Sequence, residues 1–163
     1  MSRPLLAVAA VALLWSLVPV GAFGQAAPDP LVSIMPEAQA AAGVVDAFHA
    51  ALDAGDTDAA LALMAEDVMV LEEGAAERSR DEYASHHLGA DAAYAAASVS
   101  TVTRRSGSAA GNTAWILTEG TTTGQAGNSA TSRLTVETMV LARGSDGWRI
   151  KHIHWSSRAA PAA

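Results

Sequence analysis

The sequence has 163 residues, of which 50% are hydrophobic, 17% charged and 5% aromatic, and it contains no cysteine. The lack of cysteine excludes a disulfide-stapled miniprotein, a zinc or iron–sulfur site with cysteine ligands, and a thiol enzyme. The formal net charge of −7 argues against a nucleic-acid partner, which needs a basic surface, and the length predicts a single domain.

Residues 1–26 have the pattern of a secretory signal peptide. Arg3 supplies the basic start, Leu5–Val20 form a nearly unbroken apolar run, and Gly24 and Ala26 are small residues at the expected cut point. We expect cleavage after Ala26, or alternatively after Gly24, and therefore a periplasmic or secreted protein with no membrane attachment after cleavage. The competing interpretation is an uncleaved membrane anchor, which needs about 20 apolar residues and is interrupted here by Pro19.

An extended lead-in over residues 27–37 leads into the first predicted helix. Proline is favoured in a first helical turn, so the helix is expected to run from Pro36 to about Ala54. Its apolar residues recur at helical spacing and predict one buried stripe, which contains Val44, Val45, Phe48, Ala51 and Leu52.

Two shorter helices and a strand are predicted next. Asp56 is a suitable cap for a short second helix, and the β-branched run Val68–Leu71 predicts a strand. Ser79 and Glu82 form a capping box, which predicts that a third helix begins there and covers residues 80–88.

After residue 97 the period of the hydrophobic pattern changes from helical to two, which predicts strands. The four predicted strands cover residues 98–106, 113–123, 131–143 and 148–158. Short turns between them predict an antiparallel meander, and helices followed by a long-stranded sheet indicate an α+β fold. We expect one domain over residues 38–158, followed by a tail over residues 159–163.

Two stretches carry a family resemblance. Residues 43–70, GVVDAFHAALDAGDTDAALALMAEDVMV, resemble the opening of the nuclear transport factor 2-like (NTF2-like) superfamily, especially its SnoaL-like members, and residues 146–157, DGWRIKHIHWSS, resemble its last strand. The resemblance implies a cone-like roll, in which N-terminal helices pack on a strongly curved antiparallel sheet and leave a pocket at the wide end. It also implies homodimers that form through the sheet. Isomerases, cyclases, dehydratases and binding modules share this fold, so the resemblance leaves the function open.

The predicted strand over residues 131–143 has two distinct faces. Side chains alternate between the two faces of a strand. The first face carries Arg133, Thr135, Glu137, Met139 and Leu141, and the second carries Leu134, Val136, Thr138, Val140 and Ala142. The second face is the more hydrophobic, so composition alone would turn it away from water. The resemblance instead implies that the face with Glu137 and Met139 lines the pocket and that the more hydrophobic face forms a dimer contact. The alternative for Glu137 is a carboxylate paired with Arg133 or with an arginine of a neighbouring strand.

The last predicted strand also has two faces. Alternation places Ile150, His152 and His154 on one face and Lys151, Ile153 and Trp155 on the other. Parity does not decide which face points inward, because both contain apolar residues and one β-bulge would exchange them.

These patterns predict an exported protein that binds a small, largely apolar molecule. The residues predicted to line its pocket are Tyr83, His87, Glu137, His154 and Trp155; Tyr83 and His87 are four apart and share a helix face. An acid–base enzyme of the isomerase, cyclase or dehydratase type is the alternative, with Tyr83 and Glu137 as candidate catalytic residues, because a phenol and a carboxylate can polarise a carbonyl and move a proton.

A histidine-based metal site is the second alternative. His87, His152 and His154 offer three imidazole ligands. Their spacing matches no specific metal-binding motif, so we expect no metal and no other cofactor.

Overall fold

The computed structural model of the chain describes residues 31–126 and 129–161. The predicted signal peptide and the first residues of the lead-in lie outside this part. Within the described ranges, no helix is both long enough and apolar enough to cross a membrane.

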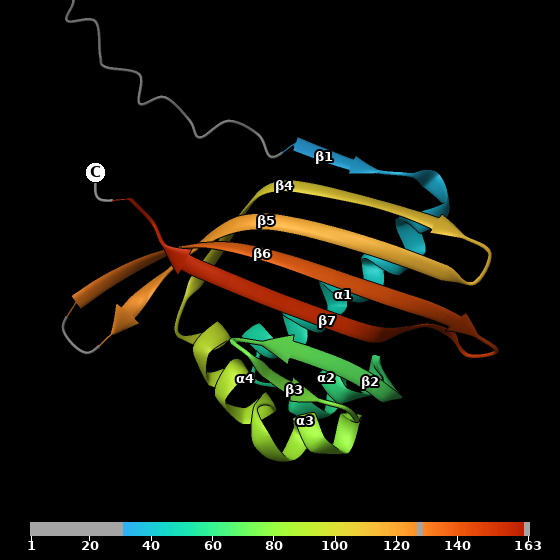
Figure 1. The fold of residues 1–163 in the computed structure, drawn as a ribbon, viewed down its shortest axis with the longest axis horizontal. Coiled ribbons are helices and arrows are strands. Elements are labelled where there is room, and N and C mark those ends of the chain that lie inside the picture. Colours follow the sequence, from blue (N-terminus) through green and yellow to red (C-terminus); the bar gives the residue numbers. More distant parts are fainter. Residues whose placement is uncertain (1–30, 127–128, 162–163) are drawn as a thin grey trace, which may run out of the picture.

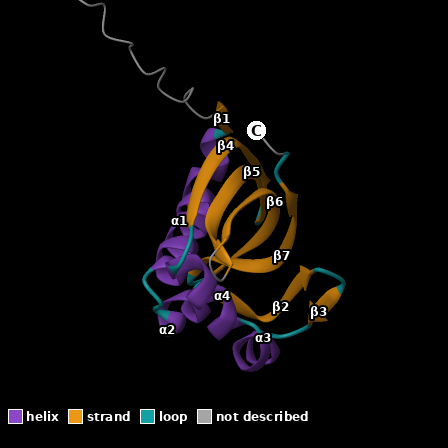
Figure 2. Cartoon of the chain, turned by 90° about the vertical axis from the view of Figure 1, so that its left-hand side faces the viewer, coloured by secondary structure: helices purple, strands orange, loops and turns teal. Residues whose placement is uncertain are grey.

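One curved sheet of seven strands forms most of the described structure (Figures 1 and 2). The strands are β1 (Leu31–Ile34), β2 (Met64–Glu72), β3 (Ala75–Glu77), β4 (Val99–Ala110), β5 (Thr113–Ala126), β6 (Ser129–Gly144) and β7 (Gly147–Ala159). Their order across the sheet is β1-β4-β5-β6-β7-β2-β3. The predicted antiparallel meander, β4 to β7, is confirmed, and the lead-in and the first predicted strand extend it as parallel partners of β4 and β7.

The helices pack on the concave side of this sheet (Figure 2). They are the 3-10 turn η1 (Pro36–Ala38) and the helices α1 (Gln39–Asp53), α2 (Thr57–Ala62), α3 (Arg80–His86) and α4 (Leu88–Ala96). Both predicted caps are present: Asp56 Oδ1 accepts from the Ala59 N–H at 3.0 Å, and Ser79 Oγ accepts from the Glu82 N–H at 3.1 Å. The third predicted helix therefore starts as expected, but it ends at His86, and α4 follows as a separate helix.

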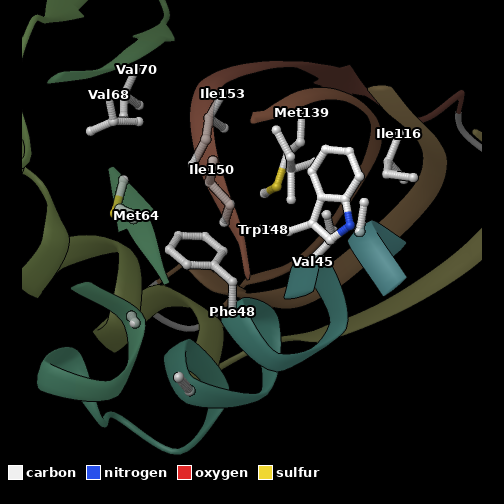
Figure 3. Close-up of a cluster of buried hydrophobic side chains, with 14 of the residues drawn as sticks. Val45, Phe48, Met64, Val68, Val70, Ile116, Met139, Trp148, Ile150 and Ile153 are labelled. Atoms are coloured by element: carbon white, nitrogen blue, oxygen red, sulfur yellow. The ribbon is translucent and has the colours of Figure 1, made fainter. Parts of the chain in front are cut away.

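The main core lies between α1 and the concave face (Figure 3). Val45 and Phe48 of α1 are fully buried and point toward side chains of the sheet, which include Ile116, Met139, Leu141, Ile150 and Ile153. Burying one side chain of this size stabilises the fold by about 1.5–3 kcal/mol. The fold is therefore the cone-like α+β roll that the resemblance implied.

Two glycines leave room for the neighbouring strand in the β4–β5 pair. A Cβ on Gly107 would lie 3.0 Å from the backbone oxygen of Trp115, and a Cβ on Gly120 would lie 2.7 Å from that of Thr101. A larger residue would therefore crowd the partner strand, most severely at Gly120.

A β-bulge in β4 turns one arginine toward the helices. The register with β5 shifts at Thr103, which is an extra residue in the strand. Beyond the shift, Arg105 pairs with Thr118 and reaches Asp46 of α1, so it lies on the concave face. Arg104 lies on the outer face.

A second β-bulge, in β7, decides the face of the last histidines. The register with β6 shifts at Lys151, so Ile150 and Ile153 both point into the core, where both are fully buried. His152 and His154 consequently share the outer face, with their ring centroids 6.5 Å apart. Strict alternation over residues 150–155 is therefore broken by the bulge.

Candidate functional site

A row of polar residues crosses the concave face from β4 to β2. Its members are register partners on adjacent strands and therefore share one face: Arg105, Thr118, Glu137, Trp155 and Glu72. The next row toward the narrow end is apolar and includes Ile116, Met139, Ile153 and Val70. The polar row is thus the first break in the hydrophobic lining of the cone.

Glu137 is the buried centre of this row. Only 9% of the residue is exposed. Its Oε2 accepts a hydrogen bond from Trp155 Nε1 at 2.7 Å and lies 2.8 Å from Nε2 of His49 on α1. Its Oε1 is buried and has no hydrogen-bond partner among the described residues. The carboxylate is therefore held firmly through Oε2, and the hydroxyl of its register partner Thr118 also stabilises the carboxylate.

The surroundings of Glu137 favour its ionised form. Burial alone would raise the pKa of Glu137, but the His49 imidazole and the Trp155 indole outweigh burial and hold that pKa below its ordinary value. Partial burial lowers the pKa of His49, but the hydrogen bond and charge of Glu137 raise it above its ordinary value. The two groups therefore form an ion pair in which each partner supports the charge of the other.

A second polar cluster lies where α3 and α4 meet β2 and β3. Tyr83 is fully buried, and its Oη donates to Asp91 Oδ2 at 2.8 Å. His87 forms an ion pair with Glu77 of β3, which is also buried. We name this group, Tyr83, His87, Glu77 and Asp91, the tyrosine cluster.

The surroundings favour the neutral form of two neighbouring carboxyl groups, Asp91 of the tyrosine cluster and Glu72 of the polar row. Burial raises the pKa of Asp91, and the Tyr83 hydroxyl compensates only in part. Burial also raises the pKa of Glu72, and the charge of Asp91 raises it further. The pKa of Tyr83 is raised by burial and by Asp91, so its phenol stays protonated.

Trp155 lies between the two groups of acids. It pairs with Glu137 on one side and with Glu72 on the other, and its ring stacks on Phe48 with centroids 6.3 Å apart. Trp155 thus lies between one carboxyl group with a lowered pKa, Glu137, and one with a raised pKa, Glu72. Carboxyl groups whose pKa values are pushed in opposite directions are the usual basis of acid–base catalysis.

The predicted site residues fall into three places. Glu137 and Trp155 meet in the polar row, and Tyr83 and His87 lie in the tyrosine cluster. His154 differs from its predicted place in the pocket: it is exposed on the outer face, because the bulge at Lys151 reverses the alternation of β7.

The three histidines proposed as metal ligands are not brought together. His152 and His154 lie on the outer face, whereas His87 contacts Glu77 on the other side of the sheet. In residues 31–126 and 129–161, no group of three histidine, aspartate or glutamate side chains is placed to hold a metal ion.

Sequence reasoning missed several residues of the site, of which His49 is the most important. His49 follows Val45 by four positions and Phe48 by one, so it lies at the edge of the buried stripe of α1. This position beside the buried stripe is the sequence signal that could have identified His49 as a residue of the site. The other missed residues are Asp91, Arg105 and Thr118, whereas Glu72 was considered from the sequence as a further acid–base candidate and interpreted as a rim residue.

Two hollows lie outside the polar row. One, of about 560 Å³, is lined by Tyr94 of α4 and by residues near the β5–β6 hairpin, which include Gln125, Thr131 and Arg133. The other, of about 190 Å³, is lined by Leu134, Val136 and Arg158 among others. Neither includes Glu137 or Trp155.

The chain is similar to known proteins over most of its length. The SnoaL-like domain model matches residues 42–161. A candidate ketosteroid isomerase from Shewanella frigidimarina is 35% identical, with a TM-score of 0.69, and the match covers 76% of this chain and 99% of that one. A candidate dehydratase of the NTF2-like family from Streptomyces avermitilis is 20% identical, with a TM-score of 0.63 and coverage of 76% and 98%.

A third similar structure is a candidate association domain of calcium/calmodulin-dependent protein kinase II from Xanthomonas campestris. It is 20% identical, with a TM-score of 0.63, and the match covers 79% of this chain and 91% of that one. No match was found among curated proteins.

Proposed function

Because the chain belongs to the SnoaL-like family, a fold that carries several unrelated functions, we propose its function from the site itself. The protein is an acid–base enzyme of the isomerase or dehydratase type. It binds a small, largely apolar molecule on the concave face and uses Glu137 as the base. The observation that carries this proposal is the buried Glu137 carboxylate, which His49 and Trp155 hold at Oε2 and which keeps a lowered pKa despite its burial.

Proton abstraction from carbon needs a base that is ionised, held in a fixed orientation and shielded from water. Glu137 fits these needs, because its lowered pKa keeps it ionised at neutral pH and two donors fix its orientation. A proton that leaves a substrate must also return to it or to a leaving group. Asp91 and Glu72 are suitable donors, because burial raises the pKa of both.

The proposal is tested by hydrogen–deuterium exchange at carbon. NMR in deuterated water follows the α-protons of a panel of cyclic ketones with and without the protein. We expect exchange to be accelerated, and Glu137→Gln to reduce this acceleration by about 10²–10⁴-fold. Glu119→Gln on β5 is the matched control, because Glu119 pairs with the outer-face Arg104. Equal exchange rates for wild type and Glu137→Gln would refute the role of Glu137.

Binding without turnover is the second candidate function. It is favoured by the hollow of about 560 Å³, which lies apart from Glu137 and is large enough for a small molecule. Native mass spectrometry of protein purified from its own host would detect a retained ligand. A ligand whose binding is weakened by Tyr94→Ala but not by Glu137→Gln would support this candidate over the enzyme.

We also propose a homodimer that forms through the outer face of the sheet. This face carries several large exposed apolar residues, which are Met69, Trp115, Leu117 and Val136; patches of this kind mark association surfaces. The likeness to an association domain supports the proposal. Light scattering at micromolar concentration should give a dimer for wild type and a monomer for Val136→Arg, and a monomeric wild type would refute it.

Export is proposed from residues 1–26. A protein purified from the periplasm or medium of its host should begin at Ala27, or at Gln25 if the alternative cut is used. Mass spectrometry of the intact chain would distinguish these outcomes from an uncleaved anchor.

A further inference from the structure

A methionine and two histidines meet on the outer face of the sheet, on the side away from Glu137. β2 and β7 are neighbouring parallel strands (Figure 1), and Met69 of β2 pairs in register with His152 of β7. His154 follows His152 by two positions and shares its face. We name these three residues, Met69, His152 and His154, the histidine–methionine group.

The burial pattern of β2 fixes the direction of Met69. Val68 and Val70 are buried in the core, whereas 43% of Met69 is exposed. Alternation along the strand therefore places the Met69 thioether on the outer face, beside the ring of His152. Of the methionines in the described residues, only Met35 is also exposed, and it follows β1 at the opposite edge of the sheet. Met69 thus brings an accessible sulfur atom to the two imidazoles.

A backbone hydrogen bond orients the ring of His152. Its Nδ1 lies 3.1 Å from the carbonyl oxygen of Met69. A carbonyl oxygen can only accept, so Nδ1 carries the proton and donates, and in the neutral ring the lone pair is on Nε2. Metal-binding histidines are commonly fixed in this way, with one ring nitrogen donating to a backbone carbonyl and the other bound to the metal.

The two histidine rings are close enough to share one metal ion. Their centroids are 6.5 Å apart. Because an imidazole nitrogen binds a transition metal at about 2 Å, two rings on opposite sides of one ion have centroids about 6 Å apart. His154 is exposed and His152 is half-buried, so small side-chain rotations bring both rings onto one ion without a change in the core.

The types of ligand select the metal. Imidazole binds zinc, copper, nickel and iron, whereas a thioether is a soft ligand that selects Cu⁺. A carboxylate would favour a harder ion, but Asp67 of β2 pairs with Lys151, which precedes His152. Copper(I) is therefore the ion that suits both kinds of ligand in the group.

We propose that the histidine–methionine group binds one copper(I) ion, through Met69 Sδ, His152 Nε2 and one ring nitrogen of His154. This set differs from the three histidines considered from the sequence, because Met69 takes the place of His87. The proposal is independent of the acid–base function, since the group lies on the opposite face of the sheet from Glu137.

Competition with bicinchoninate, a chelator that is coloured when it binds Cu⁺, measures the affinity. The titration is carried out without oxygen and with ascorbate as the reductant. We expect the purified protein to take up one Cu⁺ per chain. Met69→Leu, His152→Gln and His154→Gln should each weaken the affinity for Cu⁺ by about 10-fold to 100-fold, at least as much as the loss of a residue that only orients a ligand.

Met35→Leu and His86→Gln are matched controls. Both side chains are exposed and lie outside the group, so neither substitution should change the affinity for Cu⁺. His152→Gln also removes the hydrogen bond to the Met69 carbonyl and can disturb the pairing of β2 with β7. Met69→Leu and His154→Gln change exposed side chains, so they test the proposal even in that case. Thermal unfolding of each variant separates lost binding from lost structure.

Zinc and X-ray absorption test the role of the sulfur atom. A thioether is not among the usual ligands of Zn²⁺, so Met69→Leu should weaken the binding of Cu⁺ but not that of Zn²⁺. X-ray absorption at the copper edge should show a sulfur neighbour in wild type and none in Met69→Leu.

Three outcomes would overturn the proposal. The site is refuted if wild type takes up no Cu⁺ in the competition, or if the three variants bind it as tightly as wild type. A ratio of one Cu⁺ to two chains would refute a site formed within one chain. Binding that depends on both histidines but is unchanged by Met69→Leu would show a two-histidine chelate and refute the copper(I) site.

Discussion

The two acid groups beside Trp155 show how partners decide the charge of a buried carboxyl. Glu137 and Asp91 both lie on the helix side of the sheet. In each of them burial by itself acts to raise the pKa, and the net shift depends on the hydrogen-bond partners. Glu137 receives hydrogen bonds from an imidazole and an indole, so the net shift in its pKa is downward. Asp91 receives one from a phenol and has acidic neighbours, so its pKa stays raised.

This difference in pKa favours two different chemical roles. A lowered pKa favours the ionised carboxylate, which can accept a proton, whereas a raised pKa favours the protonated carboxyl, which can donate one. Trp155 is the only side chain of the cross-sheet row between Glu137 and Glu72. Its ring therefore donates to Glu137 and separates Glu137 from Glu72 in the row.

The largest expected effect comes from removing this ring. Trp155→Ala deletes the stack on Phe48 and the N–H donor to Glu137, so we expect a loss of about 3 kcal/mol in the free energy of unfolding. Trp155→Phe keeps a ring and removes only the donor, so the loss should be smaller, about 1.5 kcal/mol. Urea unfolding at neutral pH measures both, and equal losses would show that the N–H donor contributes more than the packing.

A smaller effect is expected in the tyrosine cluster. Tyr83→Phe removes the only described hydrogen-bond donor to Asp91 and should cost about 1 kcal/mol. It should also raise the pKa of Asp91 further, because the Tyr83 hydroxyl lowers it. Tyr94→Phe on α4 is the matched control, since Tyr94 is exposed and its change should stay within about 0.5 kcal/mol. A result in which both variants behave alike would contradict the structural role of the Tyr83 hydroxyl.

Local patterns in the sequence predicted most elements of the fold. The stripe of α1, the caps at Asp56 and Ser79, and the four meander strands all depend on neighbours close in the chain, which periodicity and capping rules describe. The parallel pairing of β1 with β4 and of β2 with β7 joins distant segments, and no local pattern encodes it.

The candidate site was harder to predict, because the two bulges at Thr103 and Lys151 change which side chains face inward. Glu137 lies in a regular stretch of β6, so the resemblance predicted its inward direction correctly, whereas composition alone favoured the opposite face. Arg105 and His154 lie beyond a bulge, where simple alternation fails. His49 meets Glu137 only through the packing of α1 on the sheet.

The smallest expected effect, a pH dependence, tests the comparison between the two acids most directly. The folded pKa of Glu137 lies below its ordinary value of 4.5, so its ionised form stabilises the fold above that pH, and this contribution is lost as the pH falls through the folded pKa. The folded pKa of Asp91 lies above its ordinary value of 3.8, so the fold loses stability as the pH rises from 3.8 through that folded value. Removing each charge should therefore change the pH dependence of the stability in opposite senses.

Relative to wild type, Glu137→Gln should become less stable and Asp91→Asn more stable as the pH rises from about 3.5 toward neutrality. Asn keeps the acceptor for Tyr83, so the Asp91→Asn effect reports mainly on charge. Urea unfolding curves of the three proteins across this range provide the measurement. For each variant, the free energy of unfolding is compared with that of wild type at each pH. If this difference changes in the same direction with pH for both variants, the two carboxyl groups do not have opposed pKa shifts, and the proposed roles of one as base and the other as acid are refuted.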